Sequence, residues 1–186
     1  MFFQRKDPVH QTMYRLVQRL EKAKIPYAIV GAMALNAHNQ RRTTDDVDVL
    51  LTAEGLAEFR RHFVDKHYEA VPGRRRRFVE RKSQVRVDVL VTGLFPGSGK
   101  PGPISYPDPA SVSLTIDDVR VVDLVTLVQL KLAARRFQDF GDVVALIRVH
   151  QLDEAFAKRL HPSVRRDFIE CLDEKRREEE YEAREG

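Results

Sequence analysis

The chain has 186 residues, which suits one domain or a small α/β core with a helical extension. Hydrophobic residues make up 42% of it, which is enough for a buried core, and charged residues make up 32%, which fits a solvent-exposed surface. A lone cysteine, Cys171, excludes an intramolecular disulfide, and no stretch resembles a secretory leader or a membrane span. We therefore expect a cytoplasmic protein. The formal charge of +4 favours anionic partners such as nucleotides or RNA, although 28 acidic residues nearly balance 32 basic ones.

Apolar residues recur at helical and strand spacings in the first third of the chain. Asp7 before Pro8 is typical of a helix start, and Gly31 interrupts a short apolar run. We expect, in order, a helix at 8–24, a strand at 27–30, a helix at 32–38, a strand at 47–51 and a helix at 53–66.

Two paired strands are expected next, at 77–81 and 84–91, joined by a tight turn at Lys82-Ser83. Residues 95–109 are rich in Pro and Gly and are expected to form a loop. Only helices are expected after it. One runs from its cap Asp123 to about Arg136, another covers 139–149, and the last ends in a charged, solvated tail.

This order of elements predicts an α/β (α+β) fold, in which a small mixed sheet is backed by helices. Residues 1–121 would form the core. Residues 122–186 would form a helical part that packs on this core, so that the chain is one compact unit.

Asp46 and Asp48 are two carboxylates one residue apart in an apolar run. On a strand they project from the same face, about 7 Å apart, and repel each other unless a cation lies between them. Asp88 occupies a similar position in the alternating segment VRVDVLV. If the two strands are neighbours, three carboxylates converge and could hold two Mg²⁺ ions. The alternative for Asp88 is an ion pair with Arg86 or a solvated strand face.

Two other positions favour an anionic ligand. Gly31 follows a strand and opens a helix, a junction whose backbone N–H groups can receive a phosphate. Lys131 aligns with Leu127 and Val128 on the inward stripe of its helix, where an ammonium needs a partner. A triphosphate oxygen or a carboxylate would serve; the alternative is a lysine that extends along the edge of the stripe to solvent.

These residues carry a resemblance. Val30-Gly31-Ala32, thirteen intervening residues and Asp46-Val47-Asp48 resemble the signature of the DNA polymerase β-type nucleotidyltransferase superfamily. The segment RTTDDVD at 42–48 and the stretch LKLAARRFQDFGD at 130–142 are similar to small bacterial nucleotidyltransferases of the abortive-infection (AbiEii-type) toxin group. The similar region runs from about residue 27 to residue 147. Where that family usually has Gly or Ser, this chain has Ala32.

The resemblance implies a small nucleotidyltransferase core and a role for each matching residue. Asp46, Asp48 and Asp88 would be catalytic and would bind two Mg²⁺ ions, for which Mn²⁺ can substitute. Asp88 would also take the proton of the acceptor hydroxyl. The residues implied in substrate binding are Gly31, Ala32, Arg42, Thr44, Lys131, Arg136 and Asp139. Asp139 as a helix cap, or paired with Arg136 at i,i+3, is the structural alternative.

Two further signals are weak. FPGSGK at 95–100 lacks the spacing of a phosphate-binding loop, and in addition Pro101 stands where that motif requires Ser or Thr. We expect a loop that borders the site, with Lys100 near the substrate. The run Arg74 to Arg77 could grip RNA phosphates, but basic runs beside a turn are more often only solvated.

The leading hypothesis is therefore a metal-dependent enzyme that moves a nucleoside monophosphate from an NTP to a hydroxyl. The acceptor would be a tRNA end or a protein side chain, and the protein would be a component of a toxin–antitoxin pair. No membrane or DNA duplex is expected as a partner. The first alternative is a non-catalytic nucleotide-binding module with the same fold. The second is a plain interaction domain whose charged tail docks a partner.

Overall fold

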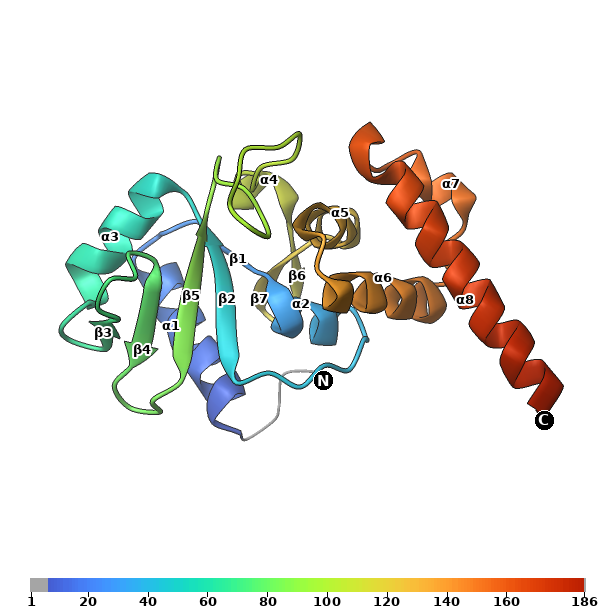
Figure 1. The fold of residues 1–186 in the computed structure, drawn as a ribbon. Coiled ribbons are helices and arrows are strands. Elements are labelled where there is room, and N and C mark those ends of the chain that lie inside the picture. Colours follow the sequence, from blue (N-terminus) through green and yellow to red (C-terminus); the bar gives the residue numbers. More distant parts are fainter. Residues whose placement is uncertain (1–6, 186) are drawn as a thin grey trace.

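The structure, a computed structural model, describes residues 7–185 (Figure 1). Residues 1–6, which belong to the opening stretch in which no leader is expected, and residue 186 lie outside the described residues. None of the helices in the described part combines the length and the apolar character that crossing a bilayer requires.

A mixed sheet of seven strands, in the order β3-β4-β5-β2-β1-β7-β6, forms the centre of the fold. The two parallel neighbours are β2 with β5 and β1 with β7. All other neighbouring strands are antiparallel. The strands are β1 (Ala28–Ile29), β2 (Asp46–Leu51), β3 (Tyr68–Ala70), β4 (Arg77–Glu80), β5 (Arg86–Val91), β6 (Ser113–Ile116) and β7 (Val119–Val122).

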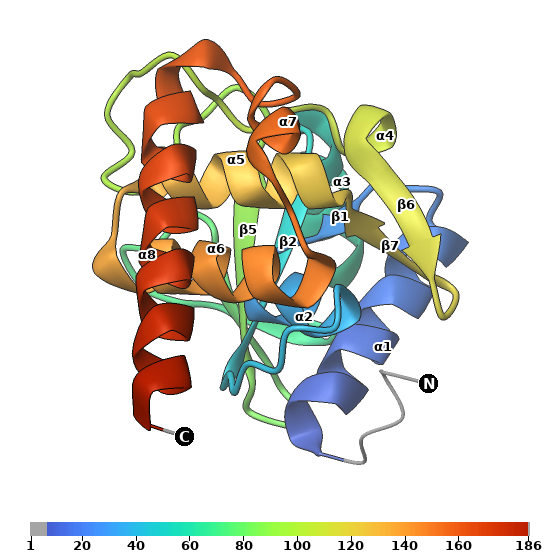
Figure 2. The ribbon, with the colours of Figure 1, turned by 90° about the vertical axis from the view of Figure 1, so that its right-hand side faces the viewer.

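Helices cover the sheet on both sides. Those N-terminal to residue 108 are α1 (Pro8–Lys22), α2 (Gly31–Ala37) and α3 (Ala53–Phe63). The later ones are α4 (Pro109–Val112), α5 (Leu124–Ala134), α6 (Phe137–His150), α7 (Glu154–Ala157), the 3₁₀ turn η1 (Pro162–Val164) and α8 (Arg165–Glu185). α1 and α3 lie on one side of the strands, and α5, α6 and α8 on the other (Figure 1). Figure 2 shows α8 outermost, crossing α5 and α6.

The alternating pattern of the central strands decides which face each side chain takes. Val87 and Val89 of β5 and Val47 and Val49 of β2 are buried, whereas the residues between them are partly exposed. α1 packs on this sheet through an apolar stripe of buried residues that includes Leu16. Asp7 caps the N-terminus of this helix, as predicted. The expected fold, a mixed sheet with flanking helices and a helical C-terminal part, is confirmed.

Several elements differ from the sequence-based expectation. β3 was not predicted, because the helix before it ends at Phe63 instead of residue 66. The hairpin of β6 and β7 replaces part of the segment where only helices were expected. Its turn is Asp117-Asp118, and both residues have positive φ (48° and 63°), which Asp tolerates better than most residues. α6 begins at Phe137, so Asp139 lies in its first turn and does not cap it.

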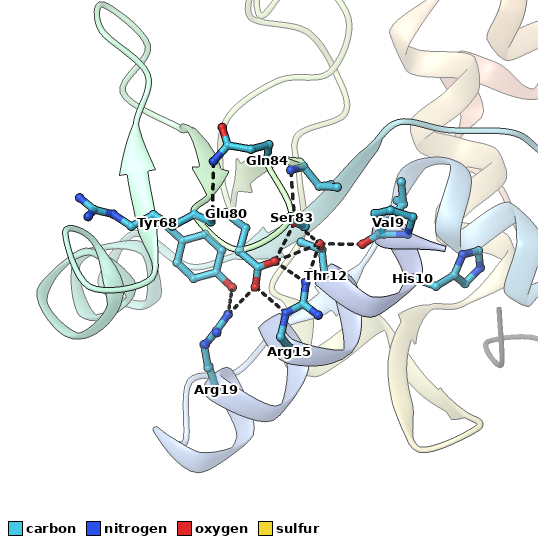
Figure 3. Close-up of polar contacts among 12 residues, drawn as sticks. Val9, His10, Thr12, Arg15, Arg19, Tyr68, Glu80, Ser83 and Gln84 are labelled. Atoms are coloured by element: carbon cyan, nitrogen blue, oxygen red, sulfur yellow. Dashed lines mark hydrogen bonds and ion pairs between the residues drawn. The ribbon is translucent and has the colours of Figure 1, made fainter. Parts of the chain in front are cut away.

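A buried carboxylate joins α1 to the edge of the sheet. Glu80, at the end of β4, is fully buried and accepts hydrogen bonds from Arg15 Nε at 2.8 Å and Arg19 Nη1 at 2.9 Å (Figure 3). Arg19 also donates to the Tyr68 hydroxyl at 2.8 Å, and Ser83 Oγ donates to Glu80 at 2.8 Å. Burial alone would raise the pKa of Glu80, but the hydrogen bonds from the arginines and Ser83 outweigh it and lower that pKa to about 2.

Candidate active site

A cavity of about 860 Å³ opens on the polar face of β2 and β5. Its walls include β2 and β5, the turn at 73–77, the loop at 95–99, and the end of α5 with the start of α6; Val30, Gly31 and Tyr106 also line it. The loop comes so close to α5 that a Cβ on Gly97, which has φ +66°, would lie 3.0 Å from the Cα of Ala134. The volume is in the range of sites that bind nucleotide-sized molecules.

Three carboxylates share one wall of this cavity. β2 and β5 are parallel neighbours, and Asp48 is the register partner of Asp88. Asp46 lies two residues before Asp48 on β2, and all three line the cavity. Side chains at alternate positions of a strand share a face, and neighbouring strands lie about 4.8 Å apart, so the convergence follows from register alone.

Two arginines pair with two of these carboxylates. Arg77, the antiparallel register partner of Asp88, donates from Nε to Oδ1 at 2.7 Å and from Nη2 to Oδ2 at 2.9 Å. Arg86 donates to Asp46, and its Nε lies 3.6 Å from Asp88 Oδ2. The alternative stated for Asp88, an ion pair with Arg86, is present at 3.6 Å, but Arg77, which was not predicted, is the closer partner. Both arginine side chains remain 39% exposed, so water competes for these ion pairs.

Asp48 differs from the other two carboxylates. Its side chain forms no hydrogen bond and no ion pair with any residue from 7 to 185. Desolvation, together with the neighbouring charges of Asp46 and Asp88, raises the pKa of Asp48 to about 7. A partly buried carboxylate without a partner is the kind of group that a bound cation would satisfy.

The donor chemistry of the trio suits a hard divalent cation, because carboxylate oxygens are the ligands such ions prefer. The arrangement of the side chains is not that of a closed metal site: no group of three His, Cys, Asp or Glu residues within the described part could hold an ion as placed. Asp46 and Asp88 face arginines instead. Metal binding would require Arg77 and Arg86 to give up these contacts.

A second charged cluster lies across the cavity, where α5 meets α6. Lys131 Nζ lies 3.1 Å from Asp139 Oδ1 and 2.7 Å from Asp142 Oδ2, and the lysine side chain is 10% exposed. Arg136 Nε lies 2.6 Å from Asp139 Oδ2, and Arg42 Nε lies 3.8 Å from Asp142 Oδ1. Three cations face two carboxylates, so the cluster keeps one net positive charge. Lys131 does point inward, and its partners are the carboxylates of α6.

The other residues implied in substrate binding take different places. Gly31 lines the cavity beside Asp48, whereas Ala32, Arg42 and Thr44 are not among the cavity-lining residues of the described part. Thr44 Oγ1 donates to Asp46 Oδ1 at 2.7 Å and so orients that carboxylate. The backbone N–H of Arg42 donates to the Asn36 side chain at 2.8 Å. These two residues support the site from behind its surface.

The sequence-based prediction missed what two cavity residues do, namely Arg77 as the partner of Asp88 and Tyr106. Arg77 could have been found, because a hairpin that turns at Lys82-Ser83 sets residue 77 opposite Asp88. Tyr106 could not, because it lies in the aperiodic loop at 95–109. Burial and then the charge of Asp48 raise the pKa of Tyr106 to about 12, so its hydroxyl stays protonated beside the carboxylates.

No protein-family model matches the sequence, and the search of curated proteins finds no match. Solved structures with a similar arrangement include a proposed nucleotidyltransferase from H. pylori (15% identity, TM-score 0.48, covering 89% of this chain and 77% of that one). Another is an antigenic nucleotidyltransferase-like protein from Paracoccidioides brasiliensis (17%, 0.47, 88% and 91%). A third is ANT(2")-Ia in complex with adenylyl-2"-tobramycin (14%, 0.46, 80% and 97%). At this level of similarity the function has to be argued from the site itself.

Proposed function

We propose that this chain is a metal-dependent nucleotidyltransferase that moves a nucleoside monophosphate from an NTP to a hydroxyl acceptor. One observation carries the proposal: Asp46, Asp48 and Asp88 line one wall of a cavity whose other walls carry Lys131 and Arg136. Carboxylates suit divalent cations and the cationic walls suit phosphates, and a nucleoside triphosphate with its metal needs both.

Each residue has a role that its position supports. Asp46, Asp48 and Asp88 would hold two Mg²⁺ ions, which when bound neutralise charge on the triphosphate. Lys131 and Arg136 would add positive charge beside the phosphates. The roles of Gly31 and Ala32 as a phosphate cradle rest on the resemblance, since α2 has only seven residues.

The transfer is an in-line displacement. The acceptor oxygen bonds to the α-phosphorus, the bond from the α-phosphorus to the bridging oxygen breaks, and pyrophosphate leaves with that oxygen. The proton of the acceptor hydroxyl goes to an Oδ atom of Asp88. Arg77 would have to release that atom first, because both Asp88 oxygens accept from it in the structure. Positioning and electrostatics would supply most of the acceleration.

A second candidate is a non-catalytic nucleotide-binding module. The ion pairs of Arg77 with Asp88 and of Arg86 with Asp46 favour it, because arginines that hold the carboxylates could replace metal ions. Ala32 at a position where the family usually has Gly or Ser points in the same direction. Both candidates bind NTP, and only the enzyme transfers label. An interaction domain would bind neither metal nor nucleotide.

The cellular role follows from the resemblance alone. Within the AbiEii-type group it implies a cytoplasmic component of a toxin–antitoxin pair, with a tRNA end or a protein side chain as acceptor.

Label transfer tests the proposal directly. The purified protein is incubated with Mg²⁺, each α-³²P-labelled NTP in turn, and total tRNA or cell lysate as acceptor. We expect label on one acceptor class, and we expect its loss in Asp46→Asn/Asp48→Asn. Asp45→Asn is the matched control, because Asp45 is exposed and lies outside the cavity lining. Metal-dependent NTP binding without transfer to either acceptor would support the binding module, and transfer by the double variant would refute the metal site.

A further inference from the structure

Three arginines on one wall of the cavity lack a partner. Arg74, Arg75 and Arg76 are exposed and line the cavity. Their guanidinium groups form no ion pair and no hydrogen bond with any residue between 7 and 185. The next residue, Arg77, differs because it holds Asp88. Clustered cations without carboxylate partners are more than a solvated turn needs, and they favour an anionic ligand.

The segment that carries these arginines is tied down by its backbone. The N–H of Arg74 donates to Val71 O at 3.0 Å, and the N–H of Val89 donates to Arg76 O at 2.8 Å. Arg60 donates to Arg75 O and stacks over the Phe78 ring, 5.4 Å from its centroid. The bond from Val89 fixes Arg76 beside the strand position that follows Asp88. The turn therefore presents its guanidinium groups at the edge of the carboxylate wall.

An exposed aromatic residue adjoins another wall of the same cavity. Phe137 is 99% exposed and opens α6, directly after Arg136, which lines the cavity. Nothing in the described part of the chain covers its ring. Aromatic rings that stand free next to cationic grooves serve as stacking platforms for the bases of single-stranded nucleic acids.

We infer that Arg74, Arg75 and Arg76 bind phosphates of a single-stranded polynucleotide acceptor and that Phe137 stacks on one of its bases. The inference rests on the proposed function, of which it names the acceptor class. An NTP alone would leave the arginine turn unused, because Lys131 and Arg136 already lie where its phosphates are proposed to bind. A protein acceptor would explain the arginines only if it were acidic, and it would leave the free ring at Phe137 without a purpose.

Binding in EDTA tests the inference separately from catalysis. Fluorescence anisotropy with a short labelled single-stranded RNA compares the wild-type protein with Arg74→Gln/Arg75→Gln/Arg76→Gln, which we call the arginine-turn variant. We expect at least tenfold weaker binding and a drop of about 2 in the slope of log K against log salt, since each phosphate contact on a single strand contributes about 0.7. Phe137→Ala should weaken binding about fivefold or more with the salt slope unchanged.

A charge-matched control is available on α8. Arg166→Gln/Arg176→Gln/Arg177→Gln removes the same charge from exposed positions outside the cavity lining, and its RNA affinity should stay within twofold of wild type. Equal losses in both triple variants, or an acidic peptide that competes as well as RNA, would overturn the inference. A labelled DNA strand of the same sequence separates the two polynucleotides. Melting curves confirm that every variant is folded.

The two proposals fail in different ways. If wild type transfers label to protein alone and the arginine-turn variant keeps its RNA affinity, the acceptor inference is wrong and the nucleotidyltransferase stands. If the arginine-turn variant loses RNA binding while wild type transfers no label to any acceptor, the polynucleotide site stands and the enzyme proposal fails.

Discussion

Gly31 lies so close to Asp48 that any side chain at residue 31 would overlap the Asp48 carboxylate. A Cβ atom on Gly31 would lie 2.9 Å from Cγ of Asp48 and closer still to its Oδ2, and the glycine has φ +60°. The backbone N–H of Val30 also donates to the Asp48 carbonyl at 3.0 Å. The start of α2 is thus seated directly on the carboxylate that lacks a partner. Glycine is required here for contact and for conformation at once.

Gly31→Ala should therefore both destabilise the protein and displace Asp48. The positive φ costs about 1–2 kcal/mol for a residue with a Cβ, and the overlap with Asp48 adds about 1–3 kcal/mol. Urea unfolding measures the sum. Gly93→Ala is the matched control, since Gly93 has φ +83° and no atom within 4 Å of its added Cβ. Equal losses in the two variants would mean that Asp48 moves aside freely.

Asp48→Asn should stabilise the metal-free protein at neutral pH. The pKa of Asp48 is raised from 3.8 to about 7 by desolvation, Asp46 and Asp88, so the folded state holds this proton more tightly than the unfolded state. Stability from this residue is therefore highest below about pH 4 and falls as the pH rises to 7. At pH 7.5 in EDTA we expect a gain on the order of a few kcal/mol.

Magnesium should narrow the difference in stability between wild type and Asp48→Asn. Binding to the native state stabilises wild type by about 2.7 kcal/mol at a hundred times the Kd, and it should leave Asp48→Asn nearly unchanged. Thermal melts with and without Mg²⁺ measure this, with Asp45→Asn as the control that keeps the response. A wild-type melting temperature that does not change with Mg²⁺ would mean that the functional state of the site is the one in which Arg77 and Arg86 pair with the carboxylates.

How far the sequence predicts this structure depends on local signals. The apolar stripe of α1 and the alternation in β5 follow from the periodicity of apolar residues, and the Asp7 cap follows from the Asp-Pro pair. All three lie where expected. The β6–β7 hairpin was missed because its turn, Asp117-Asp118, lacks the glycine that usually marks positive φ. Short β3 depends on pairing with β4, which no local pattern announces.

The candidate site divides in the same way. The shared face of Asp46 and Asp48 follows from the strand period, and only the position of Asp88 next to them needed the fold. The partners of Lys131 could not be read from the sequence, because Asp139 and Asp142 reach it only through the angle between α5 and α6. Tyr106 enters the cavity from a loop without periodicity, and side chains of that kind escape sequence patterns altogether.

The ion pairs of Lys131 change what its removal should do. Asp139 and Asp142 are 1% and 5% exposed, so Lys131→Met leaves buried charge behind and should cost about 3–5 kcal/mol. Asp142→Asn in the same chain should recover much of that loss, because Arg136 still serves Asp139. Urea unfolding of the two single variants and the double variant gives the coupling. Lys158→Met, at an exposed position, is the control.

NTP affinity separates the two roles of Lys131. If the lysine only neutralises α6, the double variant should regain wild-type NTP binding together with its stability. We expect stability to return while NTP binding stays weak, because the net charge of the cluster is unchanged but the lost cation, Lys131, lines the cavity and the lost carboxylate, Asp142, does not. Titration with a fluorescent NTP analogue measures this, and full recovery of affinity would place Lys131 outside substrate binding.

The Glu80 cluster should set the acid limit of the fold. The pKa of Glu80 is lowered from 4.5 to about 2, so its ion pairs with Arg15 and Arg19 stabilise the protein fully above about pH 4.5. That contribution is lost as the pH falls towards 2.

Glu80→Gln leaves two arginines facing a neutral amide and should cost about 3–5 kcal/mol at pH 7. Glu69→Gln, which breaks the exposed pair with Arg81, should cost at most about 1 kcal/mol. Urea unfolding between pH 2.5 and pH 7 measures both variants. A loss in Glu80→Gln that stays constant over this range would show that the stabilisation comes from packing, because loss of the ion pairs has to shrink as wild-type Glu80 is protonated.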